Sequence, residues 1–361
     1  MSDRFDIAIV GAGMAGASLA AEIAARASVV MLEAEDMPGY HATGRSAAFW
    51  TESYGGPQVQ PLTTASGPFL RDGGFLTSRA ALTIGRADQA GEVDAFVERF
   101  AALGVAVERL GRTELERRIP GLRPDWTCGA LEPDCCDIDV AALHRHYLSA
   151  AKQAGVELKV RSRLAQAGRE GAGWRIVLES GEELNVGLLV NAAGAWADPV
   201  AQAAGVGALG IAPMRRTVAQ LAVSPAASPT LPLCLDIAER FYFKPESRSI
   251  WLSPHDETPS EPCDAAPEEI DVALAIDRFE KVVDWQVERV EHRWAGLRSF
   301  APDRLPVYGF DARTPGFFWF AGQGGFGIQT APAAAKLGAT LLFGDEPEEV
   351  DPAPYRADRF V

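Results

Sequence analysis

Three glycines near the start of the chain have the spacing of a nucleotide-binding turn. Gly11, Gly13 and Gly16 follow an apolar segment and open a segment rich in small residues, and Glu33 ends the next apolar segment. In such a turn the first glycine allows a tight bend, the second lets the backbone approach a pyrophosphate, and the third lets a helix pack closely on a strand. The helix N-terminus supplies amide donors to the phosphates, and Glu33 can accept hydrogen bonds from a ribose diol. The pattern predicts a dinucleotide site.

Two later glycine-containing loops indicate which dinucleotide binds. NAD and FAD share the adenosine diphosphate half, so the first turn does not separate them. A loop at 39–48 can reach the pyrophosphate and the flavin ring, and a turn at 322–327 can direct amides at the pyrimidine end of that ring. This combination favours an extended FAD; the alternative is that the loops are ordinary turns of an α/β protein. The candidate cofactor-binding residues are Gly11, Gly13, Ala15, Gly16, Glu33, Ala34, His41, Thr43, Gly44, Arg45, Ser46, Ala47, Ala48, Arg163, Gly194, Gln323, Gly324, Gly325, Phe326, Gly327 and Ile328.

Strands that end and helices that begin at these turns must position the loops. Three glycine-marked turns, spread over the whole chain, each connect an expected strand to an expected helix. They predict one sheet assembled from discontinuous pieces, opening with a βαβ unit. We expect its strands at 5–10, 28–33, 187–193 and 316–321, and its helices at 14–26, 198–205 and 330–342.

The segments between these pieces have another pattern. One helix is predicted at 267–290 from an apolar stripe that includes Phe279, Val283 and Val287, with Pro267 at its start. Elsewhere we expect strands at 80–84, 217–223 and 240–244, and helices at 88–103 and 113–119.

The composition excludes several classes of protein. The 34 Lys plus Arg against 49 Asp plus Glu give a formal net charge of -15, which argues against a nucleic-acid partner. Five cysteines without a CxxC pair indicate neither a disulfide framework nor a metal site. No apolar run is long enough for a transmembrane segment. Acidic residues concentrate at 256–291 and 345–361, which we expect to face solvent, so the total hides a basic pocket formed by Arg45, Arg215, Arg216 and Arg298.

Six ordered motifs give the chain a resemblance to a known family. They are GYHATGRSAA (39–48), YGGPQV (54–59), VNAAGAW (190–196), FYFKP (241–245), WAGLRSF (294–300) and QGGFGIQT (323–330). Over about residues 5–330 the sequence resembles the D-amino-acid oxidase superfamily of FAD-dependent oxidoreductases, which includes glycine oxidase, sarcosine oxidase and bacterial D-amino-acid dehydrogenases. Within it, the likeness is greatest to bacterial D-arginine dehydrogenase.

The resemblance implies an α/β fold (α+β overall) with two discontinuous domains. One is a Rossmann-like FAD-binding domain of the glutathione-reductase class, and the other is a substrate-binding domain built on a mixed β-sheet. The expected boundaries are 1–50, 137–212 and 293–361 for the FAD-binding domain, and 51–136 and 213–292 for the substrate-binding domain.

The resemblance also implies how a substrate is held. In the relatives, an arginine of the motif AGLR, here Arg298, binds the substrate carboxylate together with the tyrosine of FYxKP, here Tyr242. Paired hydrogen bonds from a guanidinium to a carboxylate explain an arginine at this place. Tyr54 matches a lid-loop tyrosine, and the Gly324 carbonyl is a candidate partner for the substrate amine.

A second arginine is expected from the pair Arg215 and Arg216. Successive side chains of a strand point to opposite faces, so only one of the two should face the site, and we favour Arg216. His41 lies inside the flavin loop and is expected to contact the cofactor. Hydride transfer from the substrate Cα to the flavin N5 would give an imino acid, which water hydrolyses to a 2-oxo acid and ammonia. A dedicated general base is not apparent, and none is needed if the amine reacts as the neutral form.

Two departures from the family pattern concern the substrate. D-arginine dehydrogenases carry a histidine where this chain has Phe49, and an acidic residue, which pairs with the substrate guanidinium, where it has Ala81. A cationic side chain would lack its partner here, so we expect neutral or apolar side chains to be preferred. We expect noncovalent FAD, because the loop position that could form a covalent bond holds Ser46.

Two other functions stay open at this point. The substrate could be an N-methyl amino acid, a cyclic amino acid or a 2-hydroxy acid, since all carry the carboxylate. The chain could instead be an electron-transfer subunit or a subunit of a tRNA-modifying complex, although a pure electron carrier needs no carboxylate clamp. The expected electron acceptor is a quinone or oxygen. The expected location is the cytoplasm, with peripheral association at the inner membrane face as the alternative.

Overall fold

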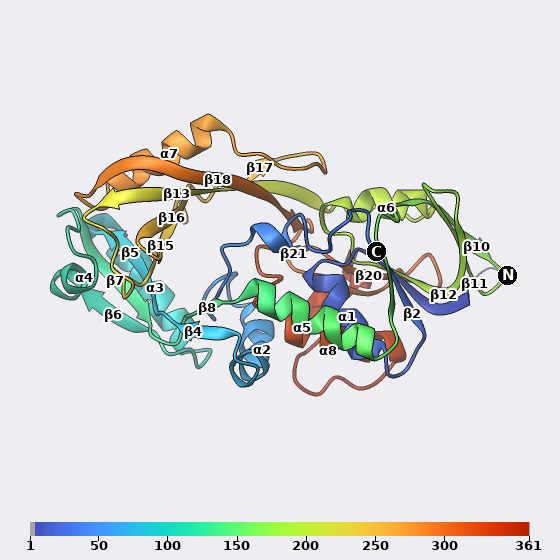
Figure 1. Ribbon diagram of the computed structural model, residues 1–361. Coiled ribbons are helices and arrows are strands. Elements are labelled where there is room, and N and C mark those ends of the chain that lie inside the picture. Colours follow the sequence, from blue (N-terminus) through green and yellow to red (C-terminus); the bar gives the residue numbers. More distant parts are fainter. Residues whose placement is uncertain (1–3, 361) are drawn as a thin grey trace.

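The computed structural model describes residues 4–360 and contains two large sheets side by side (Figure 1). The outer limits of the expected FAD-binding domain, at residues 1–3 and 361, lie outside the described residues. Two long strands, β13 and β18, run between the two halves of the molecule (Figure 1).

The first sheet contains the glycine-marked turns. β1 lies between β2 and β12, parallel to both, and β20 runs parallel to the end of β12. β10 and β11 form an antiparallel hairpin beside the start of β12. Within residues 4–360 this sheet has eight strands: β1 (Arg4–Val10), β2 (Val29–Leu32), β9 (Glu157–Lys159), β10 (Leu164–Glu170), β11 (Gly173–Leu178), β12 (Glu183–Asn191), β19 (Val307–Phe310) and β20 (Phe317–Ala321).

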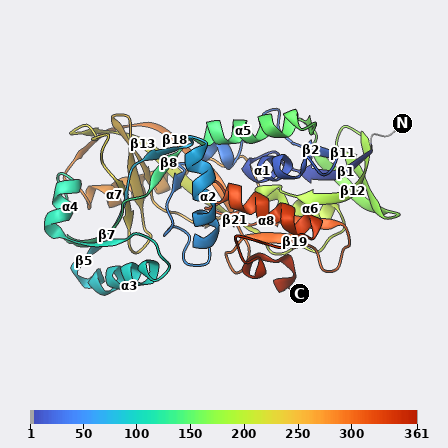
Figure 2. The same ribbon diagram turned by 90° about the horizontal axis from the view of Figure 1, so that it is seen from below.

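Both faces of this sheet are covered, which explains why its parallel strands are continuous apolar runs. Ile7 and Ile9 of β1 pack among residues of α1 and α8, whereas Ala8 and Val10 pack on the opposite side with residues of α6. α5, α1 and α8 lie side by side (Figure 2). The helices are α1 (Met14–Ile23), α5 (Val140–Gln153), α6 (Ala197–Ala203) and α8 (Ala331–Phe343).

The second sheet is mixed and carries most of the candidate substrate residues. β14 and β5 pair in parallel, and its other pairs are antiparallel. α7 packs on one face through Val272 and Phe279. Among the described residues the strand order is β21 (Gln323–Gly324), β18 (Gln286–Phe300), β13 (Ala212–Ser224), β16 (Ser249–Ser253), β15 (Tyr242–Glu246), β14 (Leu233–Asp236), β5 (Ala81–Arg86), β7 (Trp126–Glu132) and β6 (Glu108–Gly111), with β17 (Thr258–Pro259) also beside β13.

A small third sheet and three helices complete the fold. The sheet consists of β3 (Phe49–Trp50), β8 (Cys136–Ile138) and β4 (Leu76–Ser78). The helices are α2 (Gln60–Asp72), α3 (Ala90–Ala101) and α4 (Arg112–Arg118), joined by α7 (Glu269–Glu280) over the second sheet. Short 3₁₀ turns occur at Thr43–Arg45, Ala87–Gln89, Gly194–Trp196, Ala353–Tyr355 and Ala357–Phe360. No helix in the range 4–360 is long and apolar enough to cross a membrane.

The prediction of one helix over 267–290 is wrong. The helix ends at Glu280, and β18 begins at Gln286 and pairs with β13 along its whole length. Val287 and Val290 lie in this strand, and their helical spacing coincides with a shift in the strand register near Val290. Such a bulge disturbs the alternation by which a strand is recognised in a sequence.

The expected domain boundaries can be placed on this fold. The cut after residue 136 falls inside β8, and the cut after residue 292 falls inside β18. Since β18 belongs to the second sheet over its full length, a division by sheets would place 293–300 with the substrate-binding part. The division into two domains stays a prediction.

Candidate active site

One cavity of about 390 Å³ brings together residues from both large sheets and from the loop at 39–49. The predicted site residues in its lining are Gly11, Gly13, Ala15, Glu33, Ala34, His41, Thr43, Arg45, Ser46, Ala47, Ala48, Tyr54, Arg163, Gly194, Arg216, Tyr242, Arg298, Gln323, Gly324, Gly325, Gly327 and Ile328. Four other predicted residues are not part of this lining: Gly16, Gly44, Arg215 and Phe326.

The turn between β1 and α1 forms one end of the cavity. Gly11 has a φ of +100°, a conformation that favours glycine. A Cβ on Gly16 would lie 1.9 Å from the Gly11 carbonyl oxygen, so glycine is required where the helix meets the turn. The Glu33 carboxylate accepts hydrogen bonds from the Ala12 and Glu35 amides, both at 3.0 Å. These bonds fix Glu33 at the cavity wall, where a ribose diol could bind.

The N-terminus of α1 opens onto the same end. The Thr43 hydroxyl accepts a hydrogen bond from the Met14 amide at 2.9 Å and so fastens the 39–48 loop to the helix. The loop is closed on itself by the bond from the Gly44 amide to the Gly39 carbonyl. Gly13, the N-cap residue, has no side chain to cap the helix, so the next amides are suited to phosphate oxygens.

His41 provides a test of whether a large polar cofactor fits. Its Nε2 lies 3.1 Å from a Glu35 carboxylate oxygen, and its ring centroid lies 4.6 Å from that of Trp196. Its Nδ1 is buried and has no hydrogen-bond partner among residues 4–360. A buried polar atom without a partner at a cavity wall is what a bound ligand would satisfy, so the residues present fit FAD.

Arg45 and Arg163 line the cavity but are already engaged with protein groups. Arg45 donates to the Ala265 carbonyl at 2.8 Å and the Ala295 carbonyl at 3.1 Å, and it pairs with Asp264. Arg163 lies 3.3 Å from the Glu35 carboxylate. Arg45 therefore ties the flavin loop to β18.

Arg216 and Arg298 lie at the other end of the cavity. They are diagonal neighbours on adjacent antiparallel strands, because Met214 pairs with Arg298 and Arg216 pairs with Gly296. A Cβ on Gly325 would lie 1.3 Å from Nη2 of Arg298, so the glycine-rich turn before α8 makes room for this guanidinium. Both arginine side chains are largely buried, with 6% and 12% of their surface exposed.

Two tyrosines and a histidine surround these arginines. Arg298 donates to the Tyr54 hydroxyl at 2.6 Å. His255 Nδ1 lies 2.5 Å from the Glu239 carbonyl and must donate to it, which leaves Nε2 as an acceptor 3.4 Å from the same hydroxyl. Tyr242 packs edge-on against His255, with centroids 5.7 Å apart, and Phe326 packs against Tyr54. The Tyr54 hydroxyl can thus accept a hydrogen bond from Arg298 and donate one to His255.

Burial and the arginines shift the pKa values of these groups. Burial, reinforced by Arg216 and Arg298, lowers the pKa of His255 to about 2, so the ring is neutral. Burial raises the pKa of the Tyr242 phenol. Burial and the neighbouring Arg216 lower the pKa of Arg298, whose guanidinium nonetheless stays charged.

Arg215 points to the opposite face of β13, as alternation along a strand requires. It pairs with Glu268 and lies 3.1 Å from Asp271. The expectation that Arg215 helps to form the basic pocket is therefore wrong, and of the four arginines expected there Arg45, Arg216 and Arg298 line the cavity. The acidic segment does more than face solvent, because its carboxylates pair with Arg215 and with pocket arginines. These contacts join Asp264 to Arg45, Glu268 and Asp271 to Arg215, and Asp256 and Glu257 to Arg216.

Several residues at or beside the cavity were not among those predicted from the sequence. His255 and Glu257 follow β16 in a loop without a family motif, and His255 has a positive φ of 56°. Glu132 is buried in β7 and holds the loop before Tyr54. The sequence signal that could have indicated His255 and Glu257 is the polar run 255–257, which comes shortly after an apolar strand. Within residues 4–360, no three His, Cys, Asp or Glu side chains are placed to hold a metal ion.

Known proteins show the same architecture. A glycine oxidase from Geobacillus kaustophilus has a TM-score of 0.86 with 23% identity, over 98% of both chains. An L-alpha-glycerophosphate oxidase from Mycoplasma pneumoniae, solved with FAD bound, has a TM-score of 0.85 with 15% identity, over 96% of this chain and 97% of that chain. At these identities the likeness shows a shared fold.

Sequence comparisons extend this likeness. Hydrogen cyanide synthase subunit HcnC from Pseudomonas aeruginosa is 29% identical over 269 residues, which are 73% of this chain and 62% of that relative. The sequence pattern of the family described as FAD dependent oxidoreductase matches residues 6–341. The match spans nearly the whole chain and both ends of the cavity, so the chain belongs to this family of FAD-dependent oxidoreductases and its cofactor is FAD.

Proposed function

We propose that the protein catalyses the oxidative deamination of D-amino acids to 2-oxo acids and ammonia, and that it prefers neutral or apolar side chains to D-arginine. FAD supplies the hydride acceptor, at its N5. The observation that carries the proposal is the pair Arg216 and Arg298 with Tyr54 and Tyr242, at the end of the cavity opposite the glycine turn.

The arginine pair suits a carboxylate. Buried guanidinium groups bind a carboxylate with charge-assisted hydrogen bonds, and desolvation strengthens them. Tyr242 also lines the cavity and can add a hydroxyl donor, whereas the Tyr54 hydroxyl is held between Arg298 and His255 and helps to orient Arg298. Binding at this end would orient the Cα hydrogen toward the flavin, which is the main contribution that these residues can make to the reaction. The Gly324 carbonyl remains our candidate for the substrate amine.

The surroundings of Phe49 support the preference for uncharged side chains. Phe49 and Ala81 are both buried and belong to one apolar cluster with Leu233 and Tyr242. Phe49 packs edge-on against Tyr54, with centroids 5.0 Å apart. The buried Glu132 lies opposite Ala81, but its carboxylate already accepts hydrogen bonds from the Glu52 amide and the Ser53 hydroxyl. A cationic substrate side chain placed here would therefore lose water and have to compete with these donors.

A substrate panel tests the proposal. The purified flavoprotein is mixed anaerobically with neutral D-amino acids, D-arginine, L-amino acids, sarcosine and a 2-hydroxy acid, and loss of the visible flavin absorbance is followed. We expect the fastest loss with neutral D-amino acids. A higher specificity constant for D-arginine would contradict the preference for uncharged side chains. If only L-amino acids, sarcosine or the 2-hydroxy acid reduce the flavin, D-amino acids are not the substrate and that compound class takes their place. If no member of the panel reduces the flavin, the electron-transfer alternative is favoured.

A further inference from the structure

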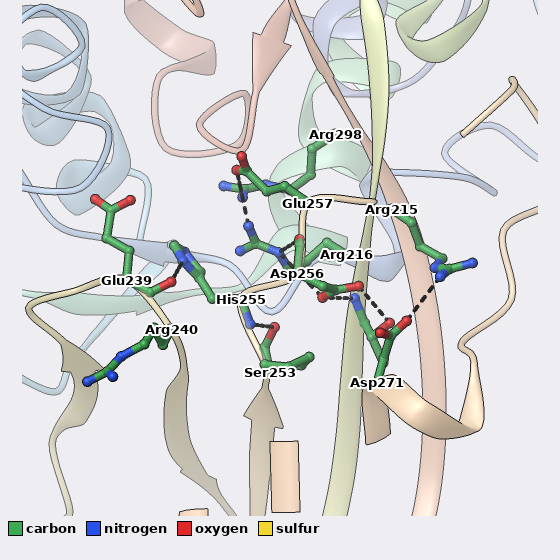
Figure 3. A network of polar contacts seen from close by, with 12 residues as sticks. Arg215, Arg216, Glu239, Arg240, Ser253, His255, Asp256, Glu257, Asp271 and Arg298 are labelled. Atoms are coloured by element: carbon green, nitrogen blue, oxygen red, sulfur yellow. Dashed lines mark hydrogen bonds and ion pairs between the residues drawn. The ribbon is translucent and has the colours of Figure 1, made fainter. Parts of the chain in front are cut away.

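A carboxylate of the chain itself lies on the proposed substrate clamp. One oxygen of Glu257 is 3.3 Å from Nη2 of Arg216 and 3.4 Å from Nη1 of Arg298 (Figure 3). Glu257 lies in the loop between β16 and β17, and about a third of its side chain is exposed. The arginine pair therefore has an internal anionic partner.

Glu257 has a second and closer partner. Arg304 Nη2 donates to both Glu257 carboxylate oxygens, at 2.8 and 2.7 Å. Arg304 lies after β18 and is about half exposed, so this pair is near solvent. The contacts of Glu257 with Arg304 are shorter than those with the buried arginines, so the carboxylate can leave the clamp without losing its main ion pair.

The loop backbone is held separately from the Glu257 side chain. The Asp256 carboxylate accepts hydrogen bonds from the Thr217 amide at 2.8 Å and the Thr217 hydroxyl at 2.9 Å. The Asp256 carbonyl accepts from Arg216 at 2.7 Å. These bonds anchor the loop to β13, so rotation of one side chain is enough to move the Glu257 carboxylate.

We propose that Glu257 is an internal competitor for the arginine pair, which a substrate carboxylate displaces toward Arg304. The idea rests on the proposed function, because it requires that Arg298 bind the substrate carboxylate. It also narrows the proposed substrates to amino acids that carry a single carboxylate. A second carboxylate near the clamp would be repelled by the displaced Glu257, whose negative charge stays within a few ångströms of the site.

The first test measures binding of benzoate, a monocarboxylate without a reactive amine, by the change that it causes in the flavin spectrum of the holoenzyme. Glu257→Gln keeps the size of the side chain and removes the competing charge. We expect it to tighten benzoate binding about tenfold, because a unit charge a few ångströms away in a partly screened site is worth this much. Glu261→Gln removes a charge from an exposed residue that follows β17 and should change binding less than twofold.

The second test uses Arg304. Arg304→Gln should weaken benzoate binding, because Glu257 then loses its alternative partner and stays on the clamp. In the Glu257→Gln background the same substitution should have little effect, since the competitor is gone. This double-mutant cycle reports the coupling of the two residues directly. A purely structural role for Glu257 predicts weaker binding in all three variants.

The outcomes separate this inference from the proposed function. If benzoate leaves the wild-type flavin spectrum unchanged up to high concentration, the carboxylate clamp itself is wrong. If benzoate binds the wild type and Glu257→Gln binds it equally or more weakly, only the role of Glu257 is overturned. The specificity for D-glutamate relative to D-glutamine should also rise in Glu257→Gln, and an unchanged ratio contradicts the monocarboxylate class.

Discussion

At the scale of single residues, the site combines groups whose protonation is fixed by their surroundings. The guanidinium groups of Arg216 and Arg298 lie close to His255, and together with burial they keep its ring neutral. Because Nδ1 of the neutral ring donates to the Glu239 carbonyl, only Nε2 can accept a hydrogen bond, and the Tyr54 hydroxyl lies within reach as its donor. His255 is thus suited to orient Tyr54, and it is a poor proton acceptor for the substrate amine.

His255 should make the stability of the protein depend on pH. Its pKa is about 2 in the folded protein, whereas an unfolded histidine has a pKa of about 6.5. Between these values the unfolded chain binds a proton that the folded chain does not, so stability falls as the pH drops below about 6.5. The slope from this residue is at most about 1.4 kcal/mol per pH unit.

The measurement is the free energy of unfolding, from denaturant titrations between pH 5 and 8. We expect His255→Gln to flatten the decrease on the acid side. The decrease should not vanish, because burial also lowers the pKa of His144. His146→Gln removes an exposed histidine and serves as the matched control. An unchanged slope in His255→Gln would show that the ring is not held neutral.

Individual site residues could be predicted from the sequence where a motif fixes their environment. Gly11 and Gly325 are determined by close contacts within the fold, and Arg298 occupies the space that Gly325 leaves. His255 and Glu257 could not be predicted in the same way. Their place depends on how β16, β13 and the following loop meet, and this meeting is a tertiary contact without a local sequence signal.

At the scale of elements, local pattern identified the strands β1, β2, β12 and β20 of the first sheet and the helices α1, α6 and α8. It did not identify β9, β10, β11, β19 or α5, and it failed at α7 and β18. The four strands were recognisable because they are short, continuous apolar runs. β18 is exposed over residues 286–293 except at the half-buried Val287, and it carries charges there, so its position follows mainly from pairing with β13. Long-range pairing of this kind overrides local preference.

The loop between β3 and α2 depends on a neighbouring strand for its position. Glu132 of β7 is buried, and its carboxylate accepts hydrogen bonds from the Glu52 amide at 2.6 Å and the Ser53 hydroxyl at 2.5 Å. Tyr54 follows directly. Because an amide is a weaker acceptor than a carboxylate, we expect Glu132→Gln to lower stability by about 1 to 3 kcal/mol and to loosen Tyr54.

The readouts separate positioning from folding. With the proposed substrate, KM should rise severalfold in Glu132→Gln while the flavin content stays unchanged. Asp134→Asn changes an exposed acid just after β7 and should leave both stability and KM unaltered. A stability loss without any change in KM would show that Glu132 supports the fold alone and does not position Tyr54.

At the scale of the whole molecule, the cavity is shared by the two sheets. Glu33 and the glycine turn belong to the first sheet, whereas Arg216, Tyr242 and Arg298 belong to the second. The resemblance in sequence predicted this division of labour. The acidic partners of the arginines could not be predicted from the resemblance. The pair of Arg45 and Asp264, for example, requires segments more than 200 residues apart to meet.

A cofactor that contacts both sheets should stabilise the molecule as one unit. A ligand that binds only the folded state adds about 2.7 kcal/mol at a free concentration 100 times its Kd. We therefore expect apoprotein to unfold at a lower temperature than holoprotein, with Tm rising as FAD is added. Glu33→Ala should reduce this rise in Tm, because it removes the group placed for the ribose diol and leaves the Ala12 amide without its acceptor. Glu35→Ala should reduce the rise in Tm less. It removes a partner of His41 and Arg163 but leaves Glu33 in place. We expect acid precipitation to release the flavin from all three proteins, because Ser46 occupies the loop position at which the resemblance to the family would place a covalent link. Flavin that remains with the precipitated chain, or an equal rise in Tm for Glu33→Ala and the wild type, would contradict this account of how the cofactor is held.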